Sequence, residues 1–170
     1  LLNSVPDSWF QLNAKQTDTQ KDTITFAYIG GLHLGRWKSL LDIEKSIKEL
    51  AKCGIKARLF IYAPQKDSNE FSHEFDAGIT VFKGFLPHDQ ISIAYEHADI
   101  LVHTESFEQQ VIEYTKYSLS TKIPECMATG KPILCYAPKV LAVSEYIDNV
   151  QAGIVVDNYN DLLEAVYKLA

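Results

Sequence analysis

Six short apolar runs, most of them separated by helical patterns, constrain the fold of this 170-residue chain more than any other feature. The runs are rich in β-branched and aromatic residues and have the length of buried strands. Strands that alternate with helices of about ten residues are typical of βαβ units, whose strands run parallel. We therefore predict the α/β class, with a single Rossmann-like parallel sheet and helices on both faces. The expected strands are 23–29, 56–62, 79–82, 99–103, 132–136 and 153–156.

The clearest helical pattern follows the first strand and begins at Arg36. Glu44 and Lys48 are expected to pair on the outer face of this helix, and Gly54 stands where a C-terminal cap belongs. Further helices are expected over 87–97, 121–129, 140–149 and 161–170. The apolar residues that recur at the spacing of one helix face are Leu40, Ile43, Ile47 and Leu50.

The length of the chain fits one domain, at roughly 150 residues per domain. Residues 11–22 are polar and carry no apolar period, so we expect 1–22 to be a linker and 23–170 to be the folded domain. The sequence opens on Leu1 and Leu2 without an initiator methionine, and it closes on a helical pattern. We therefore expect a domain excised from a longer protein.

The charge balance and the cysteines exclude several function classes. Sixteen Lys and Arg against 22 Asp and Glu give a net charge of −6, which disfavours nonspecific binding to nucleic acid or acidic membranes. Cys53, Cys126 and Cys135 show no Cys-x-x-Cys spacing, so neither a disulfide framework nor a zinc site is indicated. No apolar stretch reaches the roughly 18 residues of a membrane span. These features favour a cytoplasmic location.

Two segments carry residues suited to a phosphate-bearing ligand, and the first is the glycine-rich turn 28–38. Gly30 and Gly31 follow the first strand and Arg36 opens the helix, a place where backbone N–H groups and the helix dipole attract phosphate. The spacing matches neither Gly-x-Gly-x-x-Gly nor a Walker sequence. A turn shaped by glycines beside a solvated Arg36 explains the segment equally well.

The second segment, 117–132, is the most informative of the chain. Ser120 or Thr121 is expected to cap the following helix, which would aim its N–H groups and Lys122 at a diphosphate. Glu125, one turn further, would accept hydrogen bonds from a ribose diol. The alternative is a capped helix with Pro124 in its first turn, in which Glu125 only complements the helix dipole.

In their order along the chain, these segments resemble the C-terminal, donor-binding lobe of GT-B glycosyltransferases. The resemblance is to the retaining family-4-like, or group 1, enzymes of bacterial surface-polysaccharide assembly in particular. It implies that this chain binds a nucleotide-diphosphate sugar, while a missing N-terminal lobe brings the acceptor and a catalytic group. It runs over about 24–156, through the glycine-rich turn and the segments 82–87, 94–102, 125–133 and 152–156.

The resemblance also implies roles for the residues around the diphosphate and the ribose. Lys122 would add a second cation to a diphosphate pocket, and Glu125 would hold the ribose hydroxyls. The residues that would line the pocket are Gly30, Gly31 and Arg36.

At the two ends of the donor, the resemblance implies contacts with the base and with the sugar. The backbone around Phe85 and Leu86 would meet the base. His103 and Glu105, at the end of the fourth strand, would lie toward the sugar.

The sequence departs from the family pattern in two places. The family's Glu-x7-Glu pair would put its first glutamate at position 117, where Tyr117 stands. Either Glu105 or Glu113 replaces that carboxylate, or the Ser, Thr and Lys residues before the helix change the donor contacts. The usual Arg and Lys five residues apart after the first strand are also absent, and Lys122 is the candidate for the missing charge.

No catalytic residue, metal or cofactor is indicated by the remaining motifs. The sequence contains no Asp-x-Asp, so no carboxylate-held metal is expected on the donor diphosphate, and the five histidines lack metal-binding spacing. The expected partners are the nucleotide-sugar donor and the missing N-terminal lobe. No nucleic acid is expected, and membrane contact is expected only through the missing lobe.

Two alternative functions stay open at this point. A nucleotide-sugar epimerase would share the two-lobed architecture but would need acid and base groups within this domain. A receiver-like regulatory domain would carry paired acids after the first strand and an Asp after the third. The sequence has Gly30-Gly31 and Lys83-Gly84 at those places, which disfavours the receiver.

Overall fold

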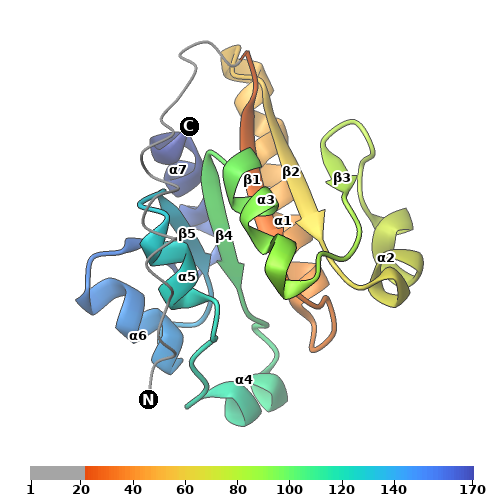
Figure 1. Ribbon diagram of the computed structural model, residues 1–170. Coiled ribbons are helices and arrows are strands. Elements are labelled where there is room, and N and C mark those ends of the chain that lie inside the picture. The colour runs from red at the N-terminus through yellow and green to blue at the C-terminus, as the bar shows by residue number, and fades with distance from the viewer. Residues whose placement is uncertain (1–21) are drawn as a thin grey trace.

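One six-stranded sheet organises the protein, and its strand order brings the first and fourth strands side by side. The computed structural model describes residues 22–170 and shows parallel strands in the order β3-β2-β1-β4-β5-β6 (Figure 1). The chain winds from β1 out to β3, then crosses to β4 and winds out to β6 on the other side. The strands are β1 (Ile24–Ile29), β2 (Ala57–Tyr62), β3 (Thr80–Phe82), β4 (Ile100–Thr104), β5 (Ile133–Tyr136) and β6 (Gly153–Val156).

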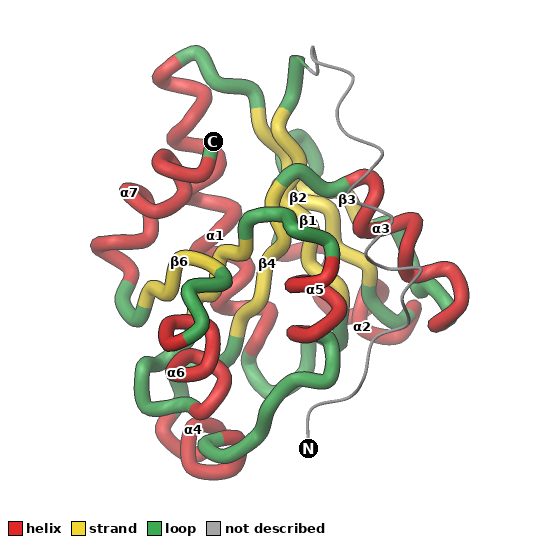
Figure 2. Tube along the Cα trace, turned by 60° about the vertical axis from the view of Figure 1, so that its left-hand side comes forward, coloured by secondary structure: helices red, strands yellow, loops and turns green. Residues whose placement is uncertain are grey.

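Helices cover both faces of this sheet, as predicted (Figure 2). Helices α1 and α7 pack against each other on one side, whereas α3 and α5 lie on the other side. The helices are α1 (Arg36–Leu50), α2 (Gln65–Phe71), α3 (Ile91–His97), α4 (Gln109–Thr115), α5 (Ile123–Ala128), α6 (Ala142–Asn149) and α7 (Tyr159–Leu169). Short 3-10 turns span Ala51–Cys53, Ser72–Glu74 and His88–Gln90.

Alternate side chains of β1 enter different apolar cores. Phe26 and Tyr28 of β1 belong to the core beneath α1 and α7, while Ala27 belongs to the core beneath α3. A third cluster joins α5 and α6 through Ile123 and Ile147. Burial on both faces explains why the strand runs show no polar alternation. The strands that lead to the following turns are therefore packed on both faces.

Several element ends differ from the sequence predictions. Helix α3 begins at Ile91 because residues 88–90 form a separate 3-10 turn. Helix α1 ends at Leu50, and Gly54 caps the 3-10 turn after it, with a φ of 78° that a glycine adopts without strain. The helices α2 and α4 were not predicted, because their short sequences show no apolar residues recurring at the spacing of a helix face.

The expected outer-face pair of Glu44 and Lys48 is wrong. Glu44 is only 6% exposed, and its carboxylate accepts hydrogen bonds from the Asp76 N–H at 3.0 Å and from the Thr80 hydroxyl. Lys48 pairs instead with Asp76, at 2.6 Å between Nζ and Oδ2. Glu44 points toward the segment that enters β3, and it satisfies a backbone donor there rather than a neighbour on its own helix.

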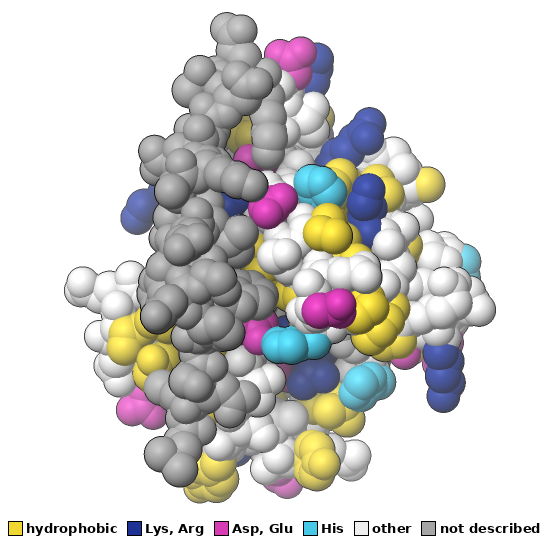
Figure 3. Space-filling view, viewed as in Figure 1, with side chains coloured by type: hydrophobic (Ala, Val, Ile, Leu, Met, Phe, Trp, Pro, Cys, Tyr) yellow, Lys and Arg dark blue, Asp and Glu magenta, His cyan; other side chains and the backbone are white. Residues whose placement is uncertain are grey.

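The predicted linker, 1–22, lies outside the described residues except for Asp22. Within residues 22–170, no helix has both the length and the apolar character needed to cross a membrane. On the face seen in Figure 3, acidic and basic side chains are interspersed and form no large patch of one sign.

Candidate functional site

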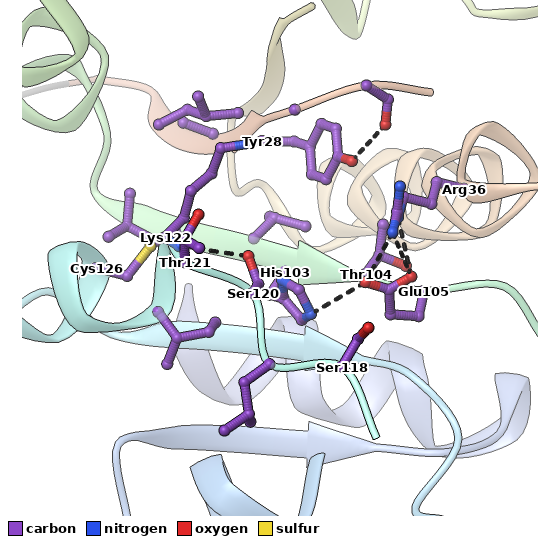
Figure 4. Close-up of a pocket in the computed structure, with 18 of the residues that line it drawn as sticks. Tyr28, Arg36, His103, Thr104, Glu105, Ser118, Ser120, Thr121, Lys122 and Cys126 are labelled. Carbon is purple, nitrogen blue, oxygen red and sulfur yellow. Dashed lines mark hydrogen bonds and ion pairs between the residues drawn. The ribbon is translucent and has the colours of Figure 1, made fainter. Parts of the chain in front are cut away.

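A cavity of about 280 Å³ opens at the carboxyl ends of β1 and β4, beside the start of α5 (Figure 4). This is the point where the crossover direction of the sheet reverses, the usual ligand position in open α/β sheets. The cavity brings the glycine-rich turn and the segment before α5 together, although they are far apart in the sequence. Eight of the eleven residues predicted from the sequence line it: Gly30, Gly31, Arg36, His103, Glu105, Ser120, Thr121 and Lys122.

Glycine at position 30 leaves room for two polar groups at the end of β1. A Cβ atom on Gly30 would lie 2.9 Å from the Tyr28 hydroxyl oxygen and 3.2 Å from Lys122 Nζ. A side chain at this position would therefore push against both groups. Lys122 thus reaches from the start of α5 to the end of β1, across the cavity.

Tyr28 is a cavity residue that the sequence analysis missed. It lines the cavity, and its hydroxyl donates a hydrogen bond to the Gly31 carbonyl oxygen at 2.7 Å. Burial raises the pKa of Tyr28, so its phenol stays protonated and remains a donor. A tyrosine two residues before the glycine pair, near the carboxyl end of the strand, is the signal that could have identified it.

Arg36 and Glu105 form an ion pair at the wall of the cavity (Figure 4). Arg36 Nε donates to Glu105 Oε2 at 2.9 Å, and Nη2 donates to Oε1 at 3.1 Å. The two side chains are only 19% and 9% exposed. Burial raises the pKa of Glu105, and the Arg36 charge opposes that rise. Since a guanidinium has five N–H donors, Arg36 keeps donors on Nη1 for a ligand.

Lys122 is the second cation of the cavity. It is the N-cap residue of α5, and no side chain caps this helix. The predicted cap by Ser120 or Thr121 is therefore wrong: Ser120 Oγ accepts the Lys122 N–H at 3.4 Å, inside the turn that precedes the helix. Burial and the nearby Arg36 charge lower the pKa of Lys122. Two cations that repel each other across a cavity favour the binding of an anion between them.

His103 presents an unsatisfied nitrogen at the end of β4. Its Nε2 atom is buried without a hydrogen-bond partner among the described residues, 3.7 Å from Glu105 Oε1. Burial, together with the charges of Arg36 and Lys122, lowers the pKa of His103 to about 3. The imidazole is therefore neutral at physiological pH, and a ligand hydroxyl could pair with Nε2 as donor or as acceptor according to the tautomer.

Three predicted residues lie outside the cavity lining: Glu125, Phe85 and Leu86. The Glu125 carboxylate accepts a hydrogen bond at 3.0 Å from the hydroxyl of Tyr95, which does line the cavity. Leu86 packs against the apolar cluster that contains Tyr95, whereas Phe85 is 65% exposed. Tyr95 therefore lies between the cavity and two of the three residues expected to hold the nucleoside.

The structure separates the two carboxylates considered as replacements for the one missing at Tyr117. Glu113 lies exposed on α4, where its carboxylate accepts a hydrogen bond from Gln109 at 3.0 Å. Tyr117 itself is 84% exposed and is absent from the cavity lining. Of these positions, Glu105 alone lines the cavity.

The cavity contains groups suited to binding a polar ligand but no activated nucleophile among its described residues. Cys126 lines it, yet burial raises the pKa of this thiol to about 12. Within residues 22–170, no three His, Cys, Asp or Glu residues are grouped so that they could hold a metal ion. The arrangement can hold an anion with Lys122 and Arg36, and it can pair polar groups of a ligand with His103 and Glu105.

Comparison with known proteins identifies the family of this domain. The family model described as Glycosyl transferases group 1 matches residues 23–170. This range includes every strand and helix of the structure. No curated protein sequence matches the chain.

Solved structures share the fold at low sequence identity. WaaG, a glycosyltransferase involved in lipopolysaccharide biosynthesis, has a TM-score of 0.63 at 15% identity, over 98% of this chain and 42% of WaaG. The C-terminal domain of LpcC, a group 1 glycosyl transferase from Francisella tularensis, scores 0.54 at 18% identity, over 86% of this chain and 74% of that one. α,α-Trehalose 6-phosphate synthase from Burkholderia multivorans scores 0.63 at 10% identity, over 99% of this chain and 41% of the synthase.

These likenesses confirm the predicted fold, a Rossmann-like lobe of the GT-B type. The chain spans less than half the length of WaaG and of the synthase.

Proposed function

The chain belongs to the group 1 glycosyltransferases, and from this membership we propose that it is the donor-binding half of such an enzyme. The enzyme would move a sugar from a nucleotide-diphosphate sugar to an acceptor. An N-terminal lobe, which would correspond to the part of WaaG that this chain does not cover, would bind the acceptor. Transfer would need both lobes, so the chain alone would bind the donor without turning it over.

The observation that carries this proposal is the convergence of Arg36 and Lys122 on one cavity at the switch point of the sheet. A leaving nucleoside diphosphate gains negative charge as the glycosidic bond to its phosphate breaks. Fixed cations and backbone N–H groups in a partly buried site stabilise such charge without reorganising. Each charge-assisted hydrogen bond contributes about 1.5–3 kcal/mol to binding.

The two sides of the cavity suggest how the donor lies in it. Lys122 and the backbone N–H of Gly31 would receive the phosphates beside Gly30, and Arg36 would stand between phosphate and sugar. Glu105, held by Arg36, would accept hydrogen bonds from sugar hydroxyls beside His103. A carboxylate in this position would repel an acidic sugar, so the donor sugar would be an uncharged one.

The nucleoside would extend from the cavity past Tyr95. Glu125 would then accept the ribose hydroxyls, and the backbone at Phe85 and Leu86 would meet the base. The support for this placement is the hydrogen bond from Tyr95, a cavity residue, to Glu125.

No metal is proposed on the diphosphate, because the cations available to it are side chains of the protein and the sequence contains no Asp-x-Asp. A role in surface-polysaccharide synthesis is proposed from the likeness to WaaG, a glycosyltransferase involved in lipopolysaccharide biosynthesis. Retention at the anomeric carbon is proposed from the resemblance to the retaining enzymes described above, and a cytoplasmic location from the cysteine pattern of the sequence. No observation favours an epimerase or a receiver over this function.

Calorimetric titration of the chain with UDP, GDP and ADP, and with the matching monophosphates, tests the proposal. We expect one diphosphate to bind at least about tenfold more tightly than its monophosphate, because the second phosphate adds a charge-assisted contact. Equal affinities for the diphosphate and its monophosphate would contradict a diphosphate site. If none of these nucleotides binds, the proposed function is wrong.

A further inference from the structure

The peptide bond between Gly31 and Leu32 is held at both of its polar atoms. The Gly31 carbonyl oxygen accepts a hydrogen bond from the Tyr28 hydroxyl at 2.7 Å. The Leu32 N–H donates to Asp67 Oδ2 at 2.6 Å. In a trans peptide these two atoms point in opposite directions, so the two side chains hold the peptide plane from opposite sides.

Asp67 has no role in the donor site described above, although it is 8% exposed and comes from α2, a helix that the sequence analysis did not predict. A buried carboxylate is costly unless hydrogen bonds satisfy it. The Leu32 N–H supplies one such bond, and His33 Nδ1 lies 3.7 Å from the same oxygen. The carboxylate is thus directed at the glycine-rich turn, 35 residues away in the sequence.

The hydrogen bonds of the neighbouring peptide groups show which backbone N–H of the turn stays unpaired. The Gly30 N–H donates to the Tyr62 carbonyl at 3.0 Å, which continues the pairing of β1 with β2. The Gly31 N–H, between these two fixed peptides, has no hydrogen-bond partner among residues 22–170. Gly31 lines the cavity. The turn therefore has one unpaired backbone donor, on a residue that lines the cavity.

The two glycines of the turn leave its backbone free to change conformation. A Cβ on Gly31 would lie 2.5 Å from Cε1 of the His33 ring, so this exposed side chain would have to turn away from a larger residue. Two consecutive glycines have wide conformational freedom, and without external restraint the peptide between them and the peptide that follows would rotate among several orientations. Hydrogen bonds from outside the turn are needed to keep one orientation.

We propose that Asp67 is a positioning residue for diphosphate binding: with Tyr28 it clamps the Gly31–Leu32 peptide and so holds the Gly31 N–H toward the cavity. This inference rests on the proposed function, because it takes the phosphate of a nucleoside diphosphate as the group that the Gly31 N–H receives. Asp67 does not touch the ligand. It acts through the backbone of the turn.

Glu44 offers a matched control for Asp67. It is also a buried carboxylate, 6% exposed, and it also accepts a backbone N–H from another segment, that of Asp76. It is absent from the cavity lining and from the glycine-rich turn. Glu44→Gln and Asp67→Ala should both lower the melting temperature, but only Asp67→Ala should affect the turn.

The first measurement is amide hydrogen exchange by ¹⁵N NMR on the ligand-free chain. Asp67→Ala should speed exchange of the Leu32 amide about tenfold or more, the factor expected from loss of a hydrogen bond to a charged acceptor, and should shift the Gly31 amide resonance. Asp67→Asn keeps an acceptor oxygen and should restore most of the protection. Glu44→Gln should leave both amides unchanged.

The second measurement is calorimetric titration of the same variants with UDP, GDP, ADP and inorganic pyrophosphate. Asp67→Ala should weaken diphosphate binding about tenfold, Asp67→Asn should weaken it far less, and Glu44→Gln should leave it unchanged. Should Asp67→Ala fold poorly, Tyr28→Phe removes the other side of the clamp and should perturb the Gly31 amide and weaken binding in the same way.

The outcomes separate this inference from the function on which it rests. If the wild-type chain binds a diphosphate and Asp67→Ala binds it equally well, the inference is overturned while the proposed function stands. If the wild-type chain binds none of these ligands, the proposed function fails and the inference fails with it. Faster exchange at Leu32 together with weaker binding, both absent in Glu44→Gln, supports the inference.

Discussion

Replacing Lys122 by Met is expected to stabilise the ligand-free chain and, at the same time, to weaken its binding to a nucleoside diphosphate. In the empty cavity, burial and the Arg36 charge both lower the pKa of Lys122. The folded state therefore disfavours the protonated side chain relative to the unfolded state, and Lys122→Met removes that cost. Because Lys122 keeps contact with solvent, we expect a gain of only about 0.5 kcal/mol, or roughly 1–2 °C in melting temperature.

The sign of this effect can be checked against pH. A base whose pKa is lowered by folding destabilises the folded state at pH values where both states are protonated. That cost disappears as the pH rises toward 10.5, the ordinary pKa of lysine. The stability advantage of Lys122→Met should therefore be largest near neutral pH and should shrink above it.

The effect on binding is larger and opposite in sign. Loss of one charge-assisted hydrogen bond to phosphate costs about 1.5–3 kcal/mol, which corresponds to a dissociation constant raised about tenfold to a hundredfold. Isothermal titration gives the affinity, and thermal unfolding with and without the nucleotide gives the stability. Bound nucleotide should raise the melting temperature of the wild type and hardly that of the variant.

Lys38 supplies the control, since it lies two residues after Arg36 but outside the cavity lining and pairs with Glu108. Lys38→Met should leave nucleotide affinity within about twofold of the wild type. The reasoning is refuted if Lys122→Met destabilises the chain and keeps full nucleotide affinity, because Lys122 would then be a structural residue.

Four further predictions concern the same site. Glu125→Gln should weaken nucleotide binding about tenfold with little change in stability, whereas a lowered melting temperature at unchanged affinity would leave Glu125 a structural residue. Glu105→Gln should weaken binding of the nucleotide sugar more than binding of the nucleoside diphosphate, and an equal effect on both would show that Glu105 does not contact the sugar. EDTA should leave nucleotide affinity unchanged in calorimetry, and a strict requirement for manganese or magnesium would contradict the proposed role of Arg36 and Lys122. The chain alone should transfer no sugar in a product assay, and measurable turnover would contradict the division of labour between two lobes.

The sheet could be predicted from the sequence because its signals are local. Buried parallel strands need continuous apolar runs, and the run at 153–156 coincides with β6 while the others agree within a residue or so at each end. Helices α2 and α4 gave no comparable signal, since their sequences have little apolar periodicity.

The site could be predicted in part, because the predicted strands determine which residues lie at the same edge of the sheet. Because the carboxyl ends of parallel strands meet at one edge, residues after β1 and β4 had to come together there. Their pairing could not be predicted: Arg36 and Glu105 are 69 residues apart, and nothing local shows that the guanidinium would hold this carboxylate. Glu44 was placed on the outer face by its spacing from Lys48, yet a backbone donor from another segment draws it inward.

The central claim is that the cavity between β1, β4 and α5 receives the diphosphate of a nucleotide sugar. Titration of the ¹⁵N-labelled chain with the nucleoside diphosphate that binds would locate the ligand directly. The account predicts that the largest amide shifts fall on Gly31 and on the residues from Ser120 to Lys122, with saturation at the affinity found by calorimetry. Shifts confined to Gly54 and Gly130, which precede β2 and β5 at the opposite edge of the sheet, or no shifts at millimolar nucleotide, would contradict it.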